Sequence, residues 1–264
     1  MSTEHSEHPP LESWTRTLNE DDALALIDLA RPGRPLSDWT AEAHETLPQA
    51  SRQRRTETIR LVRETLLDPG PGDTIAASIW LRLVHDGAPH LRTELLWTRF
   101  LFDHPWVRRA LDALLAPALA TADEPLSPRD ADRIDAATWA AFVERTLRPD
   151  VGPASIPKTR QQLQRALVRL GVLEIEDLRQ GLTRVCHARP APPVYGWAIA
   201  AEIRAAHRIE MDLDHAATAS RTARLFLVDP PYARHCLDDA VARGILRRGY
   251  LAGRPRLHPG DAQP

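Results

Sequence analysis

Residues 155–174 read SIPKTRQQLQRALVRLGVLE, and this stretch decides the fold that the sequence predicts. Its apolar side chains fall on one arc of a helix, because a helix turns by about 100° per residue. Gly171 follows where a helix C-cap is expected, and residues 172–173 and 183–188 are typical of two short strands. The stretch therefore predicts the last helix and the wing of a winged-helix-like unit. The apolar arc consists of Leu163, Ala166, Leu167 and Leu170.

The opposite arc of the same helix is cationic and rich in amides. Arginine and lysine pair with phosphates or guanine, and glutamine reaches phosphates or adenine edges. These are the donors that a helix needs to bind in a groove of DNA, so this face is the main predicted nucleic-acid site. Arg160 lies on a different side of the helix and is not part of it. The predicted site consists of Lys158, Gln161, Gln162, Arg165 and Arg169.

A similar pattern recurs near the end of the chain. A second helix is expected to begin at Asp229 and Pro230 and to end at Gly244, and residues 245–257, ILRRGYLAGRPRL, indicate a hairpin. This helix exposes a mixed face, including Arg234 and Asp238, which is poorly suited to phosphates. The hairpin is predicted to contact the DNA backbone or minor groove, and a solvated arginine edge is the alternative. Its cations are Arg247, Arg248, Arg254 and Arg256.

The first part of the chain predicts a helix-turn-helix. Helical periodicity runs over residues 11–30, a short helix opens at Ser37, and after a turn Ser51 can cap a third, basic helix. Two helices joined by a short turn also occur in every all-α protein, so a purely structural role is the alternative. Residues 66–73, LLDPGPGD, are expected to form a loop. The cations at the start of the basic helix are Arg52, Arg54 and Arg55.

The predicted domain boundary lies near Glu124. Residues 75–84, 91–102 and 105–119 are expected to be helices that form an aromatic-rich core. TADEPLSPRDAD, residues 121–132, then has the composition of a linker, with Ser127 as the cap of a new helix and Pro128 at its first position. We therefore expect a mainly α fold with two domains. Residues 1–124 form a helical, helix-turn-helix-like domain, and residues 125–264 form winged-helix-like units with short β-hairpins.

Charge divides along the same line. The 264 residues carry a net charge of -2, but residues 1–150 sum to -8 and residues 151–264 to +6. A basic C-terminal part indicates a surface that faces a polyanion. The chain has two cysteines, no apolar run long enough to cross a bilayer and no signal-peptide pattern at its start. A cytoplasmic protein without a membrane partner is expected.

Signals of catalysis and metal binding are weak. Cys186–His187 and His235–Cys236 are adjacent pairs, which make poor joint ligands for one tetrahedral zinc ion. The sequence contains no phosphate-binding glycine loop, G-x-S-x-G or H-E-x-x-H. No carboxylate is expected in an apolar setting, and Glu94 is expected to form a surface pair with His90. The sequence predicts a protein that is not an enzyme and that uses no cofactor and no metal.

Four segments resemble the BrxA family, a small component of the BREX phage-exclusion systems of bacteria. The first two are residues 51–67, SRQRRTETIRLVRETLL, and residues 94–111, ELLWTRFLFDHPWVRRAL. The others are the 155–174 stretch and residues 225–247, LFLVDPPYARHCLDDAVARGILR. The resemblance covers residues 37–257, and residues 1–36 fit the family poorly.

The resemblance implies a winged-helix-like, non-enzymatic protein that binds DNA within an antiviral defence assembly, beside a methyltransferase and an ATPase. Together with the cationic helix, it predicts an accessory protein that binds double-stranded DNA largely independently of sequence. Two alternatives remain open at this point. One is a protein-interaction adaptor within the defence complex, and the other is a winged-helix transcriptional regulator with a defined operator.

Overall fold

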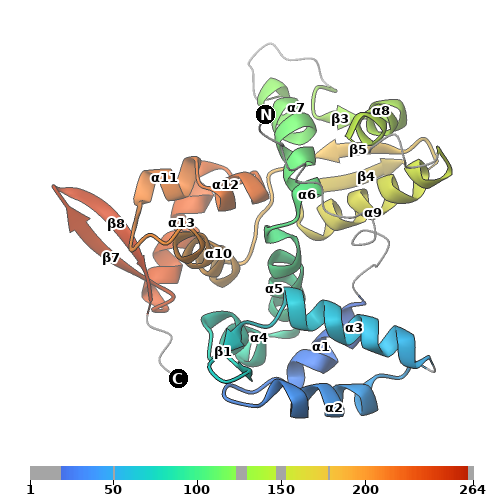
Figure 1. Cartoon of the computed structure of the whole chain (residues 1–264). Helices are drawn as coiled ribbons and strands as arrows, with labels where there is room; N and C mark the ends of the chain where they lie inside the picture. Colours follow the sequence, from blue (N-terminus) through green and yellow to red (C-terminus); the bar gives the residue numbers. More distant parts are fainter. Residues whose placement is uncertain (1–18, 50, 123–129, 147–152, 178, 261–264) are drawn as a thin grey trace, which may run out of the picture.

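In the computed structural model the chain is mainly helical with short antiparallel strand pairs, which confirms the predicted fold class (Figure 1). The structure describes residues 19–49, 51–122, 130–146, 153–177 and 179–260. The predicted boundary at Glu124 and the predicted cap at Ser127 lie outside these residues. None of the helices within them is long and apolar enough to cross a membrane.

The first winged-helix-like unit spans residues 133–185. Its strands form a three-stranded antiparallel sheet in the order β3-β5-β4. Trp139 joins its layers, because Nε1 donates to Thr183 Oγ1 at 2.8 Å and Thr183 Oγ1 donates to the Ile134 carbonyl at 3.1 Å. The elements are β3 (Arg133–Ile134), α8 (Ala136–Thr146), a 3-10 turn η3 (Pro153–Ser155), α9 (Ile156–Arg169), β4 (Leu173–Asp177) and β5 (Leu182–Val185).

The second winged-helix-like unit spans residues 192–259 and repeats this plan. Its sheet has the order β6-β8-β7, so the first strand of the unit again pairs with the last strand. The predicted helix start at Asp229 is confirmed, because its side chain accepts from the Tyr232 amide at 2.9 Å. The elements are α10 (Pro192–Ala205), β6 (Met211–Asp212), α11 (Leu213–Thr218), α12 (Arg221–Phe226), α13 (Pro230–Ala242), β7 (Leu246–Leu251) and β8 (Arg254–Pro259).

Both predicted glycine stops are confirmed. Gly171 has φ 74° and Gly244 has φ 69°, in the left-handed region that favours glycine. After α9 the Val172 amide donates to the Leu167 carbonyl at 3.2 Å, and after α13 the Ile245 amide donates to the Ala240 carbonyl at 2.9 Å. These bonds form the same Schellman-type end in both units and turn the chain into the wing.

The N-terminal group, residues 20–75, has the same order of elements in reduced form. Pro35 forms an isolated bridge to Thr74, so its place beside β2 matches that of β3 beside β5. Residues 66–73 were predicted to be a loop, but they include a strand of a small hairpin, because Gly70 pairs with Thr74. The elements are α1 (Glu20–Asp28), α2 (Leu36–Thr46), α3 (Arg52–Thr65), β1 (Pro69–Gly70) and β2 (Thr74–Ile75).

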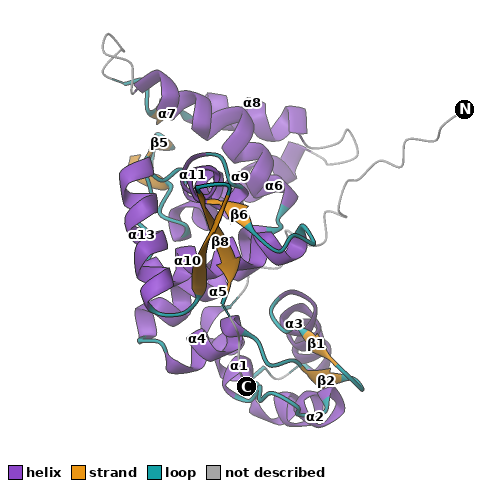
Figure 2. Ribbon diagram, turned by 90° about the vertical axis from the view of Figure 1, so that its left-hand side faces the viewer, coloured by secondary structure: helices purple, strands orange, loops and turns teal. Residues whose placement is uncertain are grey.

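A row of helices connects these parts. The row consists of α4 (Ile79–Asp86), α5 (Pro89–Phe102), α6 (Pro105–Ala110), a π-helical stretch η2 (Leu111–Leu115) and α7 (Ala116–Ala122). Helix α5 contacts α1, α9 and α10, so it joins the N-terminal group to both winged-helix-like units. It runs up the centre of Figure 1, and in Figure 2 the N-terminal group lies in the lower part of the view, beside α4. The predicted aromatic core is confirmed, with Trp80, Trp97 and Trp106 buried here.

The predicted helix start near residue 127 is wrong for the residues that the structure describes. Residues 130–132 form a turn, β3 follows, and α8 begins only at Ala136. The Asp135 side chain accepts from the Thr138 amide at 2.7 Å, so the N-cap is this aspartate. Asp130 and Asp132 therefore do not lie in the first turn of a helix.

Candidate nucleic-acid interface

Helix α9 presents the predicted cationic face to solvent. Its apolar arc is buried, and Lys158, Gln161 and Arg165 are exposed, while Gln162 is partly buried. Pro157 occupies the first turn, where a missing amide hydrogen costs no helical hydrogen bond. The sequence therefore placed this face correctly. Among the residues that the structure describes, no ion pair joins Lys158 or Arg165 to a carboxylate.

The C-terminal end of this face meets an acidic group from far away in the chain. Arg169 Nη2 lies 2.8 Å from Glu20 Oε1, at the start of α1. The same carboxylate oxygen accepts from Trp97 Nε1 at 2.8 Å, so α5 holds Glu20 in place. One of the three predicted cations is thus paired. The sequence offered no signal for this contact, because 148 residues lie between the two partners.

A cleft of about 650 Å³ separates α9 from α1. Asn19, Glu20 and Asp21 line one wall, and Arg165 and Arg169 line the other. The acidic wall repels phosphates, whereas the N-terminal half of α9 has no such neighbour in the contacts that the structure describes. A polyanion is therefore expected to approach α9 from the side of Lys158 and Gln161.

The wing of the first unit is electrically balanced. Arg133 Nε lies 2.7 Å from Glu176 Oε2, and Arg184 Nη2 lies 2.6 Å from Glu176 Oε1. Arg184 Nε also lies 3.3 Å from Asp132 Oδ2. Because Arg133 and Arg184 are already paired, we expect them to add little to phosphate binding by the first unit.

The mixed face of α13 is neutralised by ion pairs. Arg234 Nη2 lies 2.9 Å from Asp214 Oδ1, and Arg243 Nε lies 2.6 Å from Asp239 Oδ2. Arg248, on the wing, pairs with Asp238. The prediction that this helix face suits phosphates poorly agrees with these contacts.

The register of the second wing divides its four arginines between two faces. Arg248 pairs across the hairpin with Leu257, which is buried, so both side chains lie on the inner face. Arg247, Arg254 and Arg256 lie on the outer face. On this face Arg256 Nε lies 3.7 Å from Glu210 Oε1, and Arg256 Nη1 lies 3.7 Å from Asp212 Oδ2. Arg254 is exposed near the turn of the hairpin. The hairpin therefore offers a smaller cationic patch than its sequence suggests.

Sequence reasoning missed the apolar tip of this wing. Tyr250 is 74% exposed and Leu251 is 54% exposed, next to the turn at Ala252 and Gly253. In Figure 1 the hairpin extends away from the helices. The signal that could have shown the tip is the apolar pair Tyr250 and Leu251 within RRGYLAGR, because the prediction considered only the arginines of this hairpin.

The N-terminal arginines fall into two groups. Arg52 and Arg54 are exposed on the first turn of α3. Arg55 is partly buried and its Nη1 donates to the Gln49 carbonyl at 2.7 Å, which fixes the turn between α2 and α3. Arg55 therefore has a structural contact, and Arg52 and Arg54 remain a predicted nucleic-acid site.

Buried titratable groups are more numerous than the sequence predicted. Glu94 is not a surface residue paired only with His90, because its Oε1 accepts from the Ala191 amide at 2.8 Å and burial raises its pKa. Burial also raises the pKa of Asp22. The expectation that no carboxylate lies in an apolar setting is therefore wrong. The prediction used only the spacing of residues along α5, and this spacing gives no information on the contact that Ala191, just before α10, makes with Glu94.

The two cysteines are poor nucleophiles. Burial raises the pKa of the Cys186 and Cys236 thiols to about 11, so both are protonated at neutral pH. Within the described ranges, no three His, Cys, Asp or Glu side chains lie close enough to hold a metal ion.

Comparisons with protein-family models, with curated proteins and with solved structures find no match to this chain.

Proposed function

We propose that the protein binds double-stranded DNA through α9 and acts as a non-enzymatic, cytoplasmic accessory protein of a BREX-type antiviral defence system. The observation that carries the proposal is the exposed face of Lys158, Gln161 and Arg165 on the last helix of the first winged-helix-like unit. In winged-helix and helix-turn-helix proteins this helix enters the major groove. The resemblance to the BrxA family supports the defence role, with a methyltransferase and an ATPase as partners.

Phosphate contacts are expected to dominate the affinity. Three cations and two amides lie along the face, and a carboxylate that would read cytosine is absent from this set. Binding is then largely independent of base sequence. The logarithm of the binding constant should fall linearly with the logarithm of salt concentration, with a slope of about -0.9 for each phosphate neutralised.

Fluorescence anisotropy of a labelled duplex, measured over a series of salt concentrations, tests the proposal. Replacing Lys158, Arg165 and Arg169 together by Ala should reduce the slope by about 2 to 3 and leave thermal stability nearly unchanged, because these side chains are exposed. The matched control replaces Arg234, Arg243 and Arg248 by Ala, which removes the same charge from ion-paired positions. Equal slopes for the two variants would refute α9 as the site.

A second candidate function, a protein-interaction adaptor, is favoured by the exposed Tyr250 and Leu251 at the tip of the second wing. Aromatic residues with large exposed area are enriched in protein interfaces. An adaptor predicts that the purified protein does not shift a labelled duplex at low salt. It also predicts that Tyr250→Ser with Leu251→Ser abolishes retention of the partner methyltransferase or ATPase in a pull-down.

A further inference from the structure

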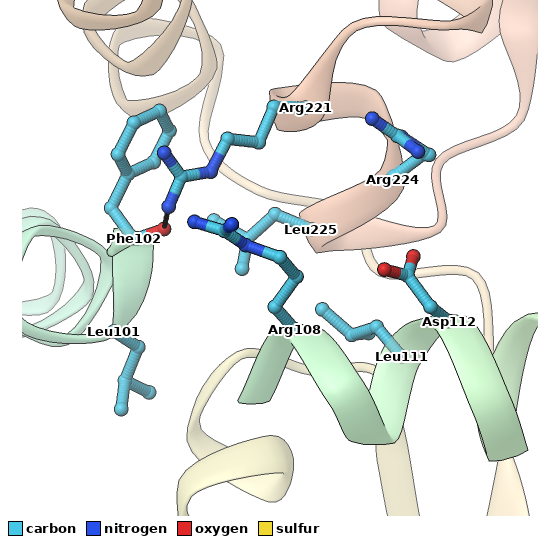
Figure 3. A pocket seen from close by; sticks show the side chains of 8 residues that line it. All are labelled: Leu101, Phe102, Arg108, Leu111, Asp112, Arg221, Arg224 and Leu225. Carbon is cyan, nitrogen blue, oxygen red and sulfur yellow. Dashed lines mark hydrogen bonds between the residues drawn. The ribbon is translucent and has the colours of Figure 1, made fainter. Parts of the chain in front are cut away.

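A small hollow lies between the row of central helices and the second winged-helix-like unit (Figure 3). Its volume is about 140 Å³. Leu101 and Phe102 at the end of α5 contribute to its apolar lining, and α12 closes the other side. Leu111 and Asp112, which also line it, are the first two residues of the π-helical stretch η2, and such stretches occur frequently at functional sites.

Three guanidinium groups line this hollow, and the most ordered belongs to Arg221. Its Nη2 donates to the Phe102 carbonyl, its Nη1 lies 2.7 Å from Asp103 Oδ1, and the guanidinium lies 4.6 Å from the centre of the Phe102 ring. These contacts tie α12 to the end of α5. Arg221 is thus fixed in place as a hydrogen-bond donor, and because Asp103 offsets its charge, the unpaired positive charge of the hollow among the described residues comes from Arg108 and Arg224.

Arg108 and Arg224 have no such partners. Within the part of the chain that the structure describes, neither guanidinium forms an ion pair or a hydrogen bond, and both side chains are exposed. Figure 3 shows the guanidinium groups of Arg108 and Arg221 pointing toward one another, with Arg224 and Asp112 apart from this pair on the other side of the hollow. An anion between Arg108 and Arg221 would accept hydrogen bonds from both guanidinium groups and would offset the unpaired charge of Arg108.

The size and chemistry of the hollow define the anion. Its volume is below the roughly 300 Å³ at which sites for drug-sized ligands begin. A whole nucleotide is therefore too large. Arginine pairs with phosphate oxygens through two parallel N–H donors. We propose that Arg108, Arg221 and Arg224 form a binding site for a single phosphate group.

This site is separate from the α9 face and does not depend on the proposed DNA binding. The phosphate group can come from free inorganic phosphate or from a nucleic-acid backbone. Asp112 is the one carboxylate in the lining of the hollow, so it opposes the anion in either case. Two measurements distinguish the sources.

The first measurement is a calorimetric titration with sodium phosphate against sodium chloride at matched ionic strength. The wild-type protein should show saturable binding, and Arg108→Ala with Arg224→Ala should weaken it about tenfold or more, because charge-assisted hydrogen bonds are lost. Asp112→Asn should strengthen it. The control, Arg82→Ala with Arg208→Ala, removes two exposed arginines from other parts of the surface and should bind phosphate as the wild type does.

The second measurement compares duplex binding by the same variants. If a DNA backbone supplies the phosphate, Arg108→Ala with Arg224→Ala lowers the salt slope by about 0.9, because one phosphate is no longer neutralised. If free phosphate is the ligand, the slope stays at the wild-type value while the calorimetric signal is lost. The proposal is overturned if neither measurement separates this variant from the wild type, or if the Arg82 and Arg208 control loses phosphate binding equally.

Discussion

The first and second winged-helix-like units share a backbone plan and differ in the charge of the surface built on it. Their sheets have the same strand order, and glycine ends α9 and α13 with the same hydrogen-bond pattern. On α9, Lys158 and Arg165 are exposed and lack an ion pair with any carboxylate that the structure describes. On the second unit, Arg234, Arg243 and Arg248 each pair with an aspartate.

This difference shows that the topology alone does not make a polyanion-binding surface. A cation that is already paired with a carboxylate gains little from a phosphate, because the local net charge is near zero. The aspartates that pair with these arginines come from α11 and α13, and the pair of Arg243 with Asp239 is the one of the three that spans a helical turn of α13. We expect the cations of α9 that are unpaired among the described residues to make it the more attractive surface for a polyanion.

The largest expected effect comes from reversing charge in the two units. Lys158→Glu with Arg165→Glu should lower the affinity for duplex DNA by about a thousandfold near 0.1 M salt, because each change replaces an attraction with a repulsion. Arg234→Glu with Arg243→Glu should change it much less. Anisotropy titrations at one salt concentration measure both. Comparable losses in the two variants would break the distinction between the units.

Lowering the pH is expected to destabilise the protein through His104, the N-cap of α6, a helix that contacts α9. Burial lowers the pKa of His104 to about 4, and its Nδ1 accepts from the Trp106 amide at the start of α6. The folded pKa lies below the unfolded value of 6.5, so the unfolded state binds the proton more readily. Stability from this residue is therefore constant above pH 6.5 and falls as the pH drops toward 4, by up to about 3 kcal/mol.

Urea unfolding at several pH values between 7 and 4 measures this effect. The control is His104→Asn, which keeps a side-chain acceptor for the helix cap and removes the titration. The free energy of unfolding of this variant should lose about 3 kcal/mol less than that of the wild type over the same range. Parallel curves for the two proteins would contradict the assignment.

The glycine stops should respond alike in both units. Gly171→Ala and Gly244→Ala each force a side chain into the left-handed region, at a cost of about 1 kcal/mol. The space around each added Cβ is adequate, since the nearest atom to the first is the Ala188 Cβ at 3.6 Å and the second has none within 4 Å. Thermal unfolding should show equal decreases in the melting temperature of the two variants. A much larger loss in one unit would mean that the two helix ends are not equivalent.

The smallest expected effect concerns the pair between Arg169 and Glu20. Glu20→Gln removes the charge and keeps an oxygen that can accept from Trp97 Nε1. Arg169 then becomes available to phosphates, and duplex affinity should rise about threefold, within the range expected for an exposed ion pair. Asp238→Asn, which releases Arg248 in the second unit, is the matched change. An unchanged or lower affinity for Glu20→Gln would show that Arg169 does not face DNA.

Much of the local structure was predictable because its causes are local. The buried and exposed arcs of α9 follow from the spacing of Leu163, Ala166 and Leu167, and the stops at Gly171 and Gly244 follow from backbone freedom. The start of α8 was mispredicted, because Ser127 and Pro128 resemble a helix start and Asp135 is an equally good cap. The pairing of β3 with β5 decides between the two caps, because residues 133–134 belong to the sheet and the helix can begin only after Asp135.

By itself the sequence determined most of the helices, their polar and apolar faces and the hairpin of the second wing, since these depend on residues a few positions apart. Only the tertiary structure decided which charges remain available. Glu20 reaches Arg169, the wing register separates Arg248 from Arg254, and α12 brings Arg221 and Arg224 opposite Arg108. The physical reason is that Coulomb interactions depend on distance in space, and packing brings together groups that are far apart along the chain.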